Sequence, residues 1–296
     1  MNRIRNNWYH RIGIMLAMVV LIASAIVPMA GCSTEAEEIN LGTAVWDYDY
    51  MSNLIAQYAL EDKGYTVNLK EITEMGIMFT AIDQGSVDLY AQVWLPNFHK
   101  SYLDAATNIV HGGSIFGEPC PYVWTIPTWV SEEYGITSIE DLKGKGDIFN
   151  GVITGLEEGT GGTTVSREAV IEYGMQDEYE YVASSISAMV AELEAAMLIK
   201  KPIIVLLWRP HPIMDRLDLT FLEDPKDVFG LDTPQWAMNT TFHDENPKIV
   251  AFMNNLLIPI SDMETMMARN DAGETEADLA REWFENNKAT VDSWWK

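Results

Sequence analysis

The stretch Pro202-Ile203-Ile204-Val205-Leu206-Leu207-Trp208 is apolar throughout and β-branched at its centre. A strand with one solvated face alternates apolar and polar residues, whereas an unbroken apolar run is typical of a strand buried on both faces, as in a parallel sheet. Residues 185–199, just before it, carry apolar side chains at helical spacing on one face. A helix that leads into a doubly buried strand predicts an α/β fold.

The same alternation of short apolar runs and helix-period segments continues along the chain from about residue 40. From residue 246 onward the pattern is mainly helical. Ser138 is expected to open a short helix at 138–143, with Asp141 three residues later. The other predicted strands are 39–46, 65–72, 87–94, 122–127 and 151–155, and the other predicted helices are 51–63, 75–84, 163–173, 246–257, 261–270 and 275–288.

The N-terminus has the pattern of a secretory signal. Three arginines precede an almost wholly apolar run, 12–29, which ends in Ala30-Gly31-Cys32. Small residues directly before a cysteine are typical of a bacterial lipoprotein signal, although an uncleaved spanning helix is the alternative. We therefore expect a signal peptide at 1–31, lipidation of Cys32, a polar tether at 32–39, and an extracytoplasmic protein held on the membrane by its lipid.

The formal net charge is −25, and residues 1–31 contain arginines but no acidic residue. A surface this acidic repels nucleic acid and anionic lipid headgroups, which excludes a nucleic-acid partner. Cys120 is the one cysteine left after lipidation, so no intramolecular disulfide or cysteine metal site is expected. The size of the chain without its signal is above that of a usual single core and favours two lobes.

Three of the predicted strands end in a tryptophan: Trp46, Trp94 and Trp208. Taken alone, Trp94 in the stretch Val93-Trp94-Leu95-Pro96 is best interpreted as a core residue. In open α/β sheets, however, ligands bind outside the carboxyl ends of the strands. Three aromatic rings at such ends favour a cleft that binds a cation, and a quaternary ammonium fits because it donates no hydrogen bonds.

Five short motifs occur along the chain: 94–99 (Trp-Leu-Pro-Asn-Phe-His), 208–211 (Trp-Arg-Pro-His), 222–230, 155–161 and 138–143. In combination they are fairly specific, and together they resemble the substrate-binding proteins of glycine betaine ABC transporters. The resemblance runs from about residue 41 to residue 296.

This resemblance implies a two-lobed fold of the periplasmic-binding-protein type (type II). Each lobe is expected to hold a mostly parallel sheet flanked by helices, with the ligand in the cleft between the lobes. Lobe I is expected at 40–118 plus 232–296, and lobe II at 119–231. Such proteins close on a small ligand and pass it to an ABC permease and its ATPase, with no cofactor of their own.

In Gram-positive members of the family, three tryptophans form a cage around the trimethylammonium group. Trp94 and Trp208 match two of them, but residues 255–258, where the third should fall, contain no aromatic side chain. The missing wall is expected from Trp46, Tyr48, Tyr50 or Trp236, with Trp46 favoured by its place at a strand end.

Where these relatives hold a ligand carboxylate with backbone amides, this chain has Asp49 and Tyr50. Either Asp49 points away or the ligand lacks a carboxylate there, as choline does. Arg209 is a candidate partner for a carboxylate or, somewhat better, the partner of one of the many acids. His211 and His99 lack a third metal ligand at suitable spacing, so their expected role is to orient their turns and no metal is predicted.

The ligand-site residues are thus expected to be Trp94, Trp208, Trp46, Tyr50, Asp49, His211 and Arg209. The expected function is a non-catalytic receptor for glycine betaine or a related quaternary ammonium compound. Two alternatives remain open. One is an enzyme on the same fold with Cys120 as nucleophile and His111 or His99 as base. The other is a lipoprotein that senses a ligand and signals to a partner.

Overall fold

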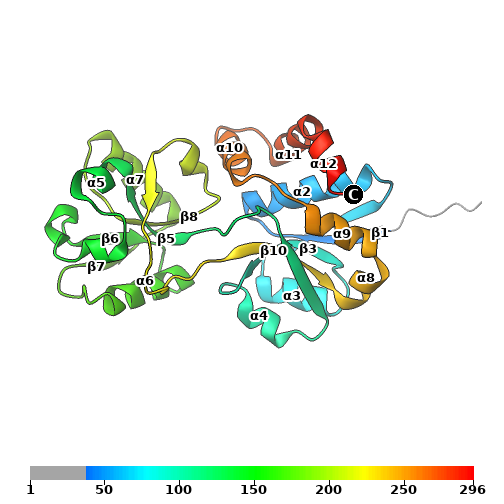
Figure 1. Cartoon of the computed structure of the whole chain (residues 1–296), viewed down its shortest axis with the longest axis horizontal. Helices are drawn as coiled ribbons and strands as arrows, with labels where there is room; N and C mark the ends of the chain where they lie inside the picture. The colour runs from blue at the N-terminus through cyan, green and yellow to red at the C-terminus, as the bar shows by residue number, and fades with distance from the viewer. Residues whose placement is uncertain (1–37) are drawn as a thin grey trace, which may run out of the picture. The chain divides into compact units, whose positions relative to one another are not determined.

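The computed structural model describes residues 38–296, which form two lobes, each built around one five-stranded sheet (Figure 1). The lobe I sheet has the order β2-β1-β3-β10-β4, with strands β1 (Glu38–Thr43), β2 (Thr66–Glu71), β3 (Leu89–Leu95), β4 (Ile109–Ser114) and β10 (Thr233–Asn239). The lobe II sheet has the order β7-β6-β8-β5-β9, with strands β5 (Tyr122–Pro127), β6 (Val152–Gly155), β7 (Glu180–Ala183), β8 (Val205–Trp208) and β9 (Leu219–Phe221).

Both sheets are mixed, with two parallel and two antiparallel pairings in each, where mostly parallel sheets were predicted. In lobe I, β1 is parallel to β2 and β3, while β10 is antiparallel to its neighbours β3 and β4. In lobe II, β6 is parallel to β7 and β8, while β5 is antiparallel to β8 and β9. Each sheet therefore has one strand, β10 or β5, that runs against the other four. Strand β5 is the first strand after the chain passes from lobe I to lobe II, and β10 is the first after it returns to lobe I.

Helices flank both sheets. Those of lobe I are α2 (Asp47–Glu61), α3 (Met75–Asp83), α4 (Lys100–Ala105), α8 (Thr240–Glu245), α9 (Pro247–Asn255), α10 (Ile260–Asp271), α11 (Glu276–Asn286) and α12 (Lys288–Ser293). Those of lobe II are α5 (Thr128–Tyr134), α6 (Gly161–Glu172), α7 (Ile186–Leu198) and three 3₁₀ helices, η1 (Ile139–Leu142), η2 (Gly146–Phe149) and η3 (Pro212–Asp215).

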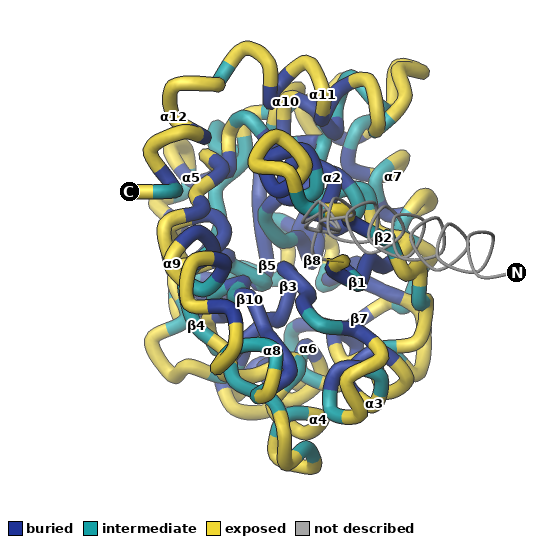
Figure 2. Tube along the Cα trace, turned by 90° about the vertical axis from the view of Figure 1, so that its right-hand side faces the viewer, coloured by how far each residue is buried: buried dark blue, intermediate teal, exposed yellow. Residues whose placement is uncertain are grey.

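Apolar sequence places the strands at the centre of each lobe. Every residue of β3 is buried, and β8 is buried up to its last residue. In Figure 2 the buried residues gather along the strands, and exposed residues cover the outer helices and loops. Because lobe I and lobe II have separate apolar clusters, each lobe has its own core.

The chain crosses between the sheets twice, after β4 and after β9. The two crossing segments lie side by side, because the Cys120 N–H donates to the Asp232 carbonyl at 2.7 Å (Figure 1). The predicted lobe boundaries, 118/119 and 231/232, fall in these two segments and stay a prediction.

Several boundaries differ from the sequence predictions. The strand predicted at 39–46 ends at Thr43, and the one predicted at 202–208 begins only at Val205, after Pro202, which has no N–H for a ladder. The predicted tether reaches residue 39, whereas β1 already begins at Glu38. The signal peptide and Cys32 lie outside the described residues. Ser138 opens the predicted short helix, which is the 3₁₀ helix η1, and forms a capping box with Asp141.

No helix within residues 38–296 combines the length and the apolar character that a membrane crossing needs.

Candidate functional site

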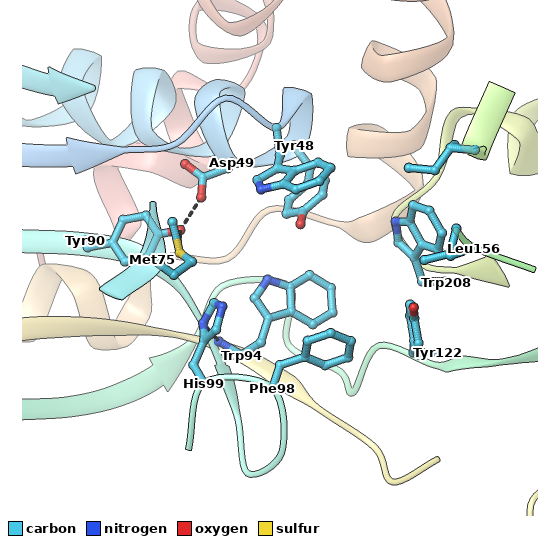
Figure 3. A pocket seen from close by; sticks show the side chains of 12 residues that line it. Tyr48, Asp49, Met75, Tyr90, Trp94, Phe98, His99, Tyr122, Leu156 and Trp208 are labelled. Atoms are coloured by element: carbon cyan, nitrogen blue, oxygen red, sulfur yellow. Dashed lines mark hydrogen bonds between the residues drawn. The ribbon is translucent and has the colours of Figure 1, made fainter. Parts of the chain in front are cut away.

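A cavity of about 230 Å³ lies between the lobes, and side chains of both line it (Figure 3). Its lobe I lining is Trp46, Tyr48, Asp49, Met75, Tyr90, Trp94, Phe98 and His99, and its lobe II lining is Tyr122, Leu156, Ile186 and Trp208.

Strand ends bring the main rings together. Trp94 is the next-to-last residue of β3, and Trp208 is the last residue of β8. Tyr122 is the first residue of β5, which is antiparallel to β8, so Tyr122 pairs directly with Trp208. The carboxyl ends of the parallel strands thus point into the cleft, as the fold class requires.

The rings of the lining contact one another in two groups, one on each side of the cavity. Tyr48 meets Trp94 edge to face at a centroid distance of 5.7 Å, and Tyr122 lies 5.8 Å from Trp208. Figure 3 shows Tyr48 and Trp94 on one side of the space and Trp208 and Tyr122 on the other. A desolvated cation in a small space is stabilised where ring faces are turned toward it, because the face of an aromatic ring carries the negative end of its quadrupole.

Trp46 lines the cavity, but from a different secondary-structure position than the one predicted. It is the N-cap residue of α2 rather than the end of β1, and 47% of it is exposed. Tyr48, which follows in the first turn of α2, is the more enclosed ring. Of the four candidates for the missing wall, Trp46 and Tyr48 line the cavity, and both come from the start of α2.

Asp49 lies at the lobe I end of the cavity with its carboxylate held on several sides. Its Oδ1 accepts from the Ala44 N–H at 2.8 Å, the Asn53 amide at 3.0 Å and the Thr43 hydroxyl at 3.3 Å. The Tyr90 hydroxyl donates to Oδ2. Burial raises the pKa of Asp49 to about 6, while these hydrogen bonds act to lower it. Among the described residues that line the cavity, Asp49 is the one carboxylate, and none is Lys or Arg.

The two histidines of the Trp-Xaa-Pro turns hydrogen-bond within their own turns. His99 Nδ1 accepts from the Trp94 N–H at 3.0 Å, and His211 Nδ1 accepts from the Ile213 N–H at 3.2 Å. Burial lowers the pKa of each to about 4, so both are neutral at pH 7. His99 lines the cavity, whereas His211 is outside the lining and packs its ring edge to face against Trp208 at 4.9 Å.

Two other predicted site residues are not brought into the cavity. The Arg209 guanidinium forms two hydrogen bonds with the Glu264 carboxylate, at 2.7 and 2.6 Å, so it pairs with an acid of this chain. Tyr50 packs against the lobe I core. Trp236, the remaining wall candidate, is buried and donates to Asn254 at 3.1 Å.

Sequence reasoning missed Tyr122 and Phe98 as wall residues. Both belong to motifs or strands that the sequence marked, but the direction of β5 and the packing of the turn after β3 decide that their rings face the cavity. Met75, Tyr90, Leu156 and Ile186 complete the lining. Of these, Leu156 belongs to the motif at 155–161, and the other three carried no sequence signal for a ligand site.

Cys120 does not fit the role of a nucleophile. Its side chain is fully buried, and burial raises the pKa of its thiol well above the usual range. A nucleophilic cysteine needs thiolate character and access, and Cys120 has neither.

Residues 37–286 match the family model described as the substrate binding domain of ABC-type glycine betaine transport systems. The chain belongs to this family. It is therefore a substrate receptor of an ABC transporter and not an enzyme.

Relatives and solved structures agree with this family. The glycine betaine/carnitine transport binding protein of Listeria monocytogenes is 30% identical over 154 residues, which span about half of each chain (51% of both). The glycine betaine/proline betaine-binding periplasmic protein of Salmonella typhimurium is 23% identical over 82% of this chain and 84% of its own. Lactococcal OpuAC, solved closed with glycine betaine, is 25% identical with a TM-score of 0.71, covering 88% of this chain and all of that one (100%).

Proposed function

We propose that this receptor binds a small quaternary ammonium compound in the interlobe cavity and delivers it to an ABC permease. The observation that carries the proposal is the aromatic lining contributed by both lobes, chiefly Trp94 and Tyr48 from lobe I and Trp208 and Tyr122 from lobe II. A quaternary ammonium leaves water for such rings at little cost, because it gives up no donated hydrogen bond. Each ring contributes about 0.5–2 kcal/mol, depending on desolvation.

The charge of the lining favours a ligand that carries no carboxylate. A zwitterion such as glycine betaine would bring a second carboxylate toward Asp49 without meeting a Lys or Arg side chain of the lining. A cation with a hydroxyl group, of which choline is the simplest, offers Asp49 both a positive charge and a hydrogen-bond donor. We therefore place choline ahead of glycine betaine within the quaternary ammonium class.

A panel of ligands tests whether choline binds more tightly than glycine betaine. Titration calorimetry on residues 33–296 should give heat with choline, and weaker binding with glycine betaine, proline betaine and carnitine. If none of the four binds a folded sample, the quaternary ammonium proposal is wrong. If glycine betaine binds tighter than choline, only the role given to Asp49 is wrong.

Asp49→Asn separates the contribution of the Asp49 charge from that of the aromatic lining. It keeps the shape of the side chain and removes the charge, so choline affinity should fall by about tenfold or more while glycine betaine affinity stays level or rises. Equal losses for both ligands would mean that the substitution acts on the fold rather than on ligand charge.

Trp94→Ala should lower affinity for the bound ligand by more than tenfold. Because Trp94 is almost fully buried, the variant also loses packing, and about 3–5 kcal/mol of stability is expected to go with it. Trp236→Ala is the matched control, a buried lobe I tryptophan outside the cavity. It should lose similar stability and keep its affinity.

For the position in the cell, we propose that the receptor works outside the cytoplasm, anchored by lipid on Cys32 and tethered by the residues that follow. The lipoprotein pattern at residues 30–32 supports this. Intact mass measurement and membrane fractionation test it: wild-type protein should carry acyl chains and sediment with membranes, and Cys32→Ala should not. Unmodified Cys32 in membrane-bound protein would instead favour an uncleaved anchor.

A further inference from the structure

A second set of contacts joins the lobes outside the ligand cavity. It connects the segment after β8 in lobe II with α10 in lobe I. Figure 1 shows α10 on the side of lobe I that faces this segment. Three polar pairs span the junction: Arg209 with Glu264, Asp215 with Thr265 at 3.3 Å, and Arg216 with Asp271 at 3.8 Å.

The Arg209–Glu264 pair differs from a usual surface ion pair in its geometry and its burial. Both its hydrogen bonds are short, at 2.7 and 2.6 Å, and the planar guanidinium meets the carboxylate with two nitrogens in parallel. The Glu264 side chain is 6% exposed and that of Arg209 is 28% exposed. Removing one partner would leave the other charge partly desolvated without compensation. Separating the lobes here would break both hydrogen bonds of the pair.

Arg209 is also tied to the aromatic cavity. It follows Trp208 directly, and its N–H donates to the Pro121 carbonyl at 3.1 Å, next to the paired tyrosine Tyr122. His211, two residues further on, packs against the Trp208 ring and caps the N-terminus of η3. The segment that carries Trp208 is thus held on one side by β5 and on the other by α10 of the opposite lobe.

From this arrangement we propose that the Arg209–Glu264 pair holds the lobes together around the cavity and fixes the position of Trp208 for ligand binding. Arg209 and Glu264 are positioning residues, since neither lines the cavity. The apparent affinity of a receptor falls in proportion to the fraction of molecules in the binding-competent conformation. Loss of the pair should therefore weaken binding without removing any ligand contact.

The effect on affinity rests on the proposed function, but the effect on the lobes does not, so two readouts are needed. The first is the radius of gyration of the unliganded protein in solution scattering. The second is the choline dissociation rate, followed by tryptophan fluorescence in stopped flow. The variants are Glu264→Gln, Arg209→Gln and the double variant, with Glu158→Gln as matched control, because the Glu158–Arg167 pair is exposed and lies within lobe II.

The double variant distinguishes positioning from folding. The single variants leave a lone charge and should lower the unfolding midpoint, whereas the double variant leaves none and should recover most of that loss. If the pair holds the lobes, the double variant still has a larger unliganded radius of gyration and releases choline at least fivefold faster. Glu158→Gln should stay within twofold of wild type.

Two results would overturn the inference. One is a double variant with the wild-type radius of gyration. The other is a dissociation rate that recovers together with the unfolding midpoint, which would leave the pair a purely structural role. Should the wild-type protein bind no quaternary amine at all, the scattering comparison still decides, and the failure then belongs to the proposed function.

Discussion

The ring of Phe98 meets the ring of Tyr122 edge to face, with a centroid distance of 4.9 Å and an interplanar angle of 84°. Phe98 belongs to the turn after β3 in lobe I, and Tyr122 opens β5 in lobe II. The contact therefore closes the aromatic lining across the cleft, and it joins the two lobes at the site itself.

Phe98→Ala should weaken ligand binding through this contact. An aromatic pair contributes about 0.5–1.5 kcal/mol beyond area burial, which corresponds to roughly a two- to tenfold loss of affinity. Because 45% of Phe98 is exposed, the unfolding midpoint should change little. Titration calorimetry beside a thermal melt measures both. Phe98→Leu keeps apolar area without a ring, and an unchanged affinity in both variants would contradict a role for the contact.

Two adjacent glycines at the start of α6 offer a matched pair of substitutions. A Cβ on Gly162 would lie 2.0 Å from the Tyr122 hydroxyl oxygen and 2.8 Å from Leu206, whereas a Cβ on Gly161 would meet no atom within 4 Å. Gly162→Ala must therefore displace Tyr122 or shift the helix, at a cost of about 1–3 kcal/mol. Gly161→Ala should be neutral or stabilising by up to about 1 kcal/mol.

Urea unfolding and ligand titration of both glycine variants check this prediction. Gly162→Ala should lose stability and affinity together, because Tyr122 forms part of the cavity wall. A Gly162→Ala protein with wild-type affinity would mean that Tyr122 can move without affecting the ligand.

Asp232 connects the crossing segment to the turn that carries Phe98. Its carboxylate accepts from the N–H groups of Asn97 at 2.6 Å and Phe98 at 3.2 Å. Asp232→Asn replaces one acceptor by a donor that faces an N–H, so we expect a loss of about 1–3 kcal/mol and weaker ligand binding. Asp83→Asn is the control, because Asp83 also accepts two backbone N–H bonds, both at 2.7 Å, but on an exposed surface of lobe I.

Chemical denaturation and calorimetry on the two variants give the comparison. Asp83→Asn should lose less stability and keep its ligand affinity. Equal affinities in both variants would show that the turn after β3 does not depend on Asp232 for its binding conformation.

The α/β class was predicted because it depends on local pattern. Trp94, which local pattern alone assigns to the core, and Trp208 were predicted at the cleft from three strand ends taken together and from the family resemblance. An apolar run such as residues 202–208 needs a doubly covered sheet wherever it lies in the fold. A tryptophan at the end of such a strand then faces the cleft by the geometry of parallel sheets. The family resemblance added the two-lobed arrangement, which no local pattern indicates.

What the sequence did not predict depends on partners distant in the chain. Strand β10 was not predicted, although its insertion between β3 and β4 completes the lobe I sheet. The direction of β5, which brings Tyr122 beside Trp208, follows from pairing with β8 and not from residues 122–127 themselves. For Arg209 the sequence favoured an acid of the chain somewhat over a ligand carboxylate, but only the position of α10 beside it identifies that acid as Glu264.

Ligand affinity should depend on pH through Asp49. With a pKa raised to about 6 by burial, Asp49 is mostly ionised at pH 7.5 and mostly protonated at pH 5. A cationic ligand binds the ionised form better, so choline affinity should fall by up to about tenfold between pH 7.5 and pH 5. His99 and His211, with pKa values of about 4, stay neutral over this window and do not contribute.

The stability contribution of the same group should change in the opposite direction. Because the folded pKa lies above the ordinary value of 3.8, the folded state binds this proton more tightly, and the stabilisation is lost as pH rises through 6. In Asp49→Asn both dependences should disappear, so the difference between wild type and variant isolates them from other groups. Calorimetry and unfolding at pH 5 and pH 7.5 measure the two slopes. If choline affinity varies equally in both proteins, Asp49 is not the group that faces the ligand charge.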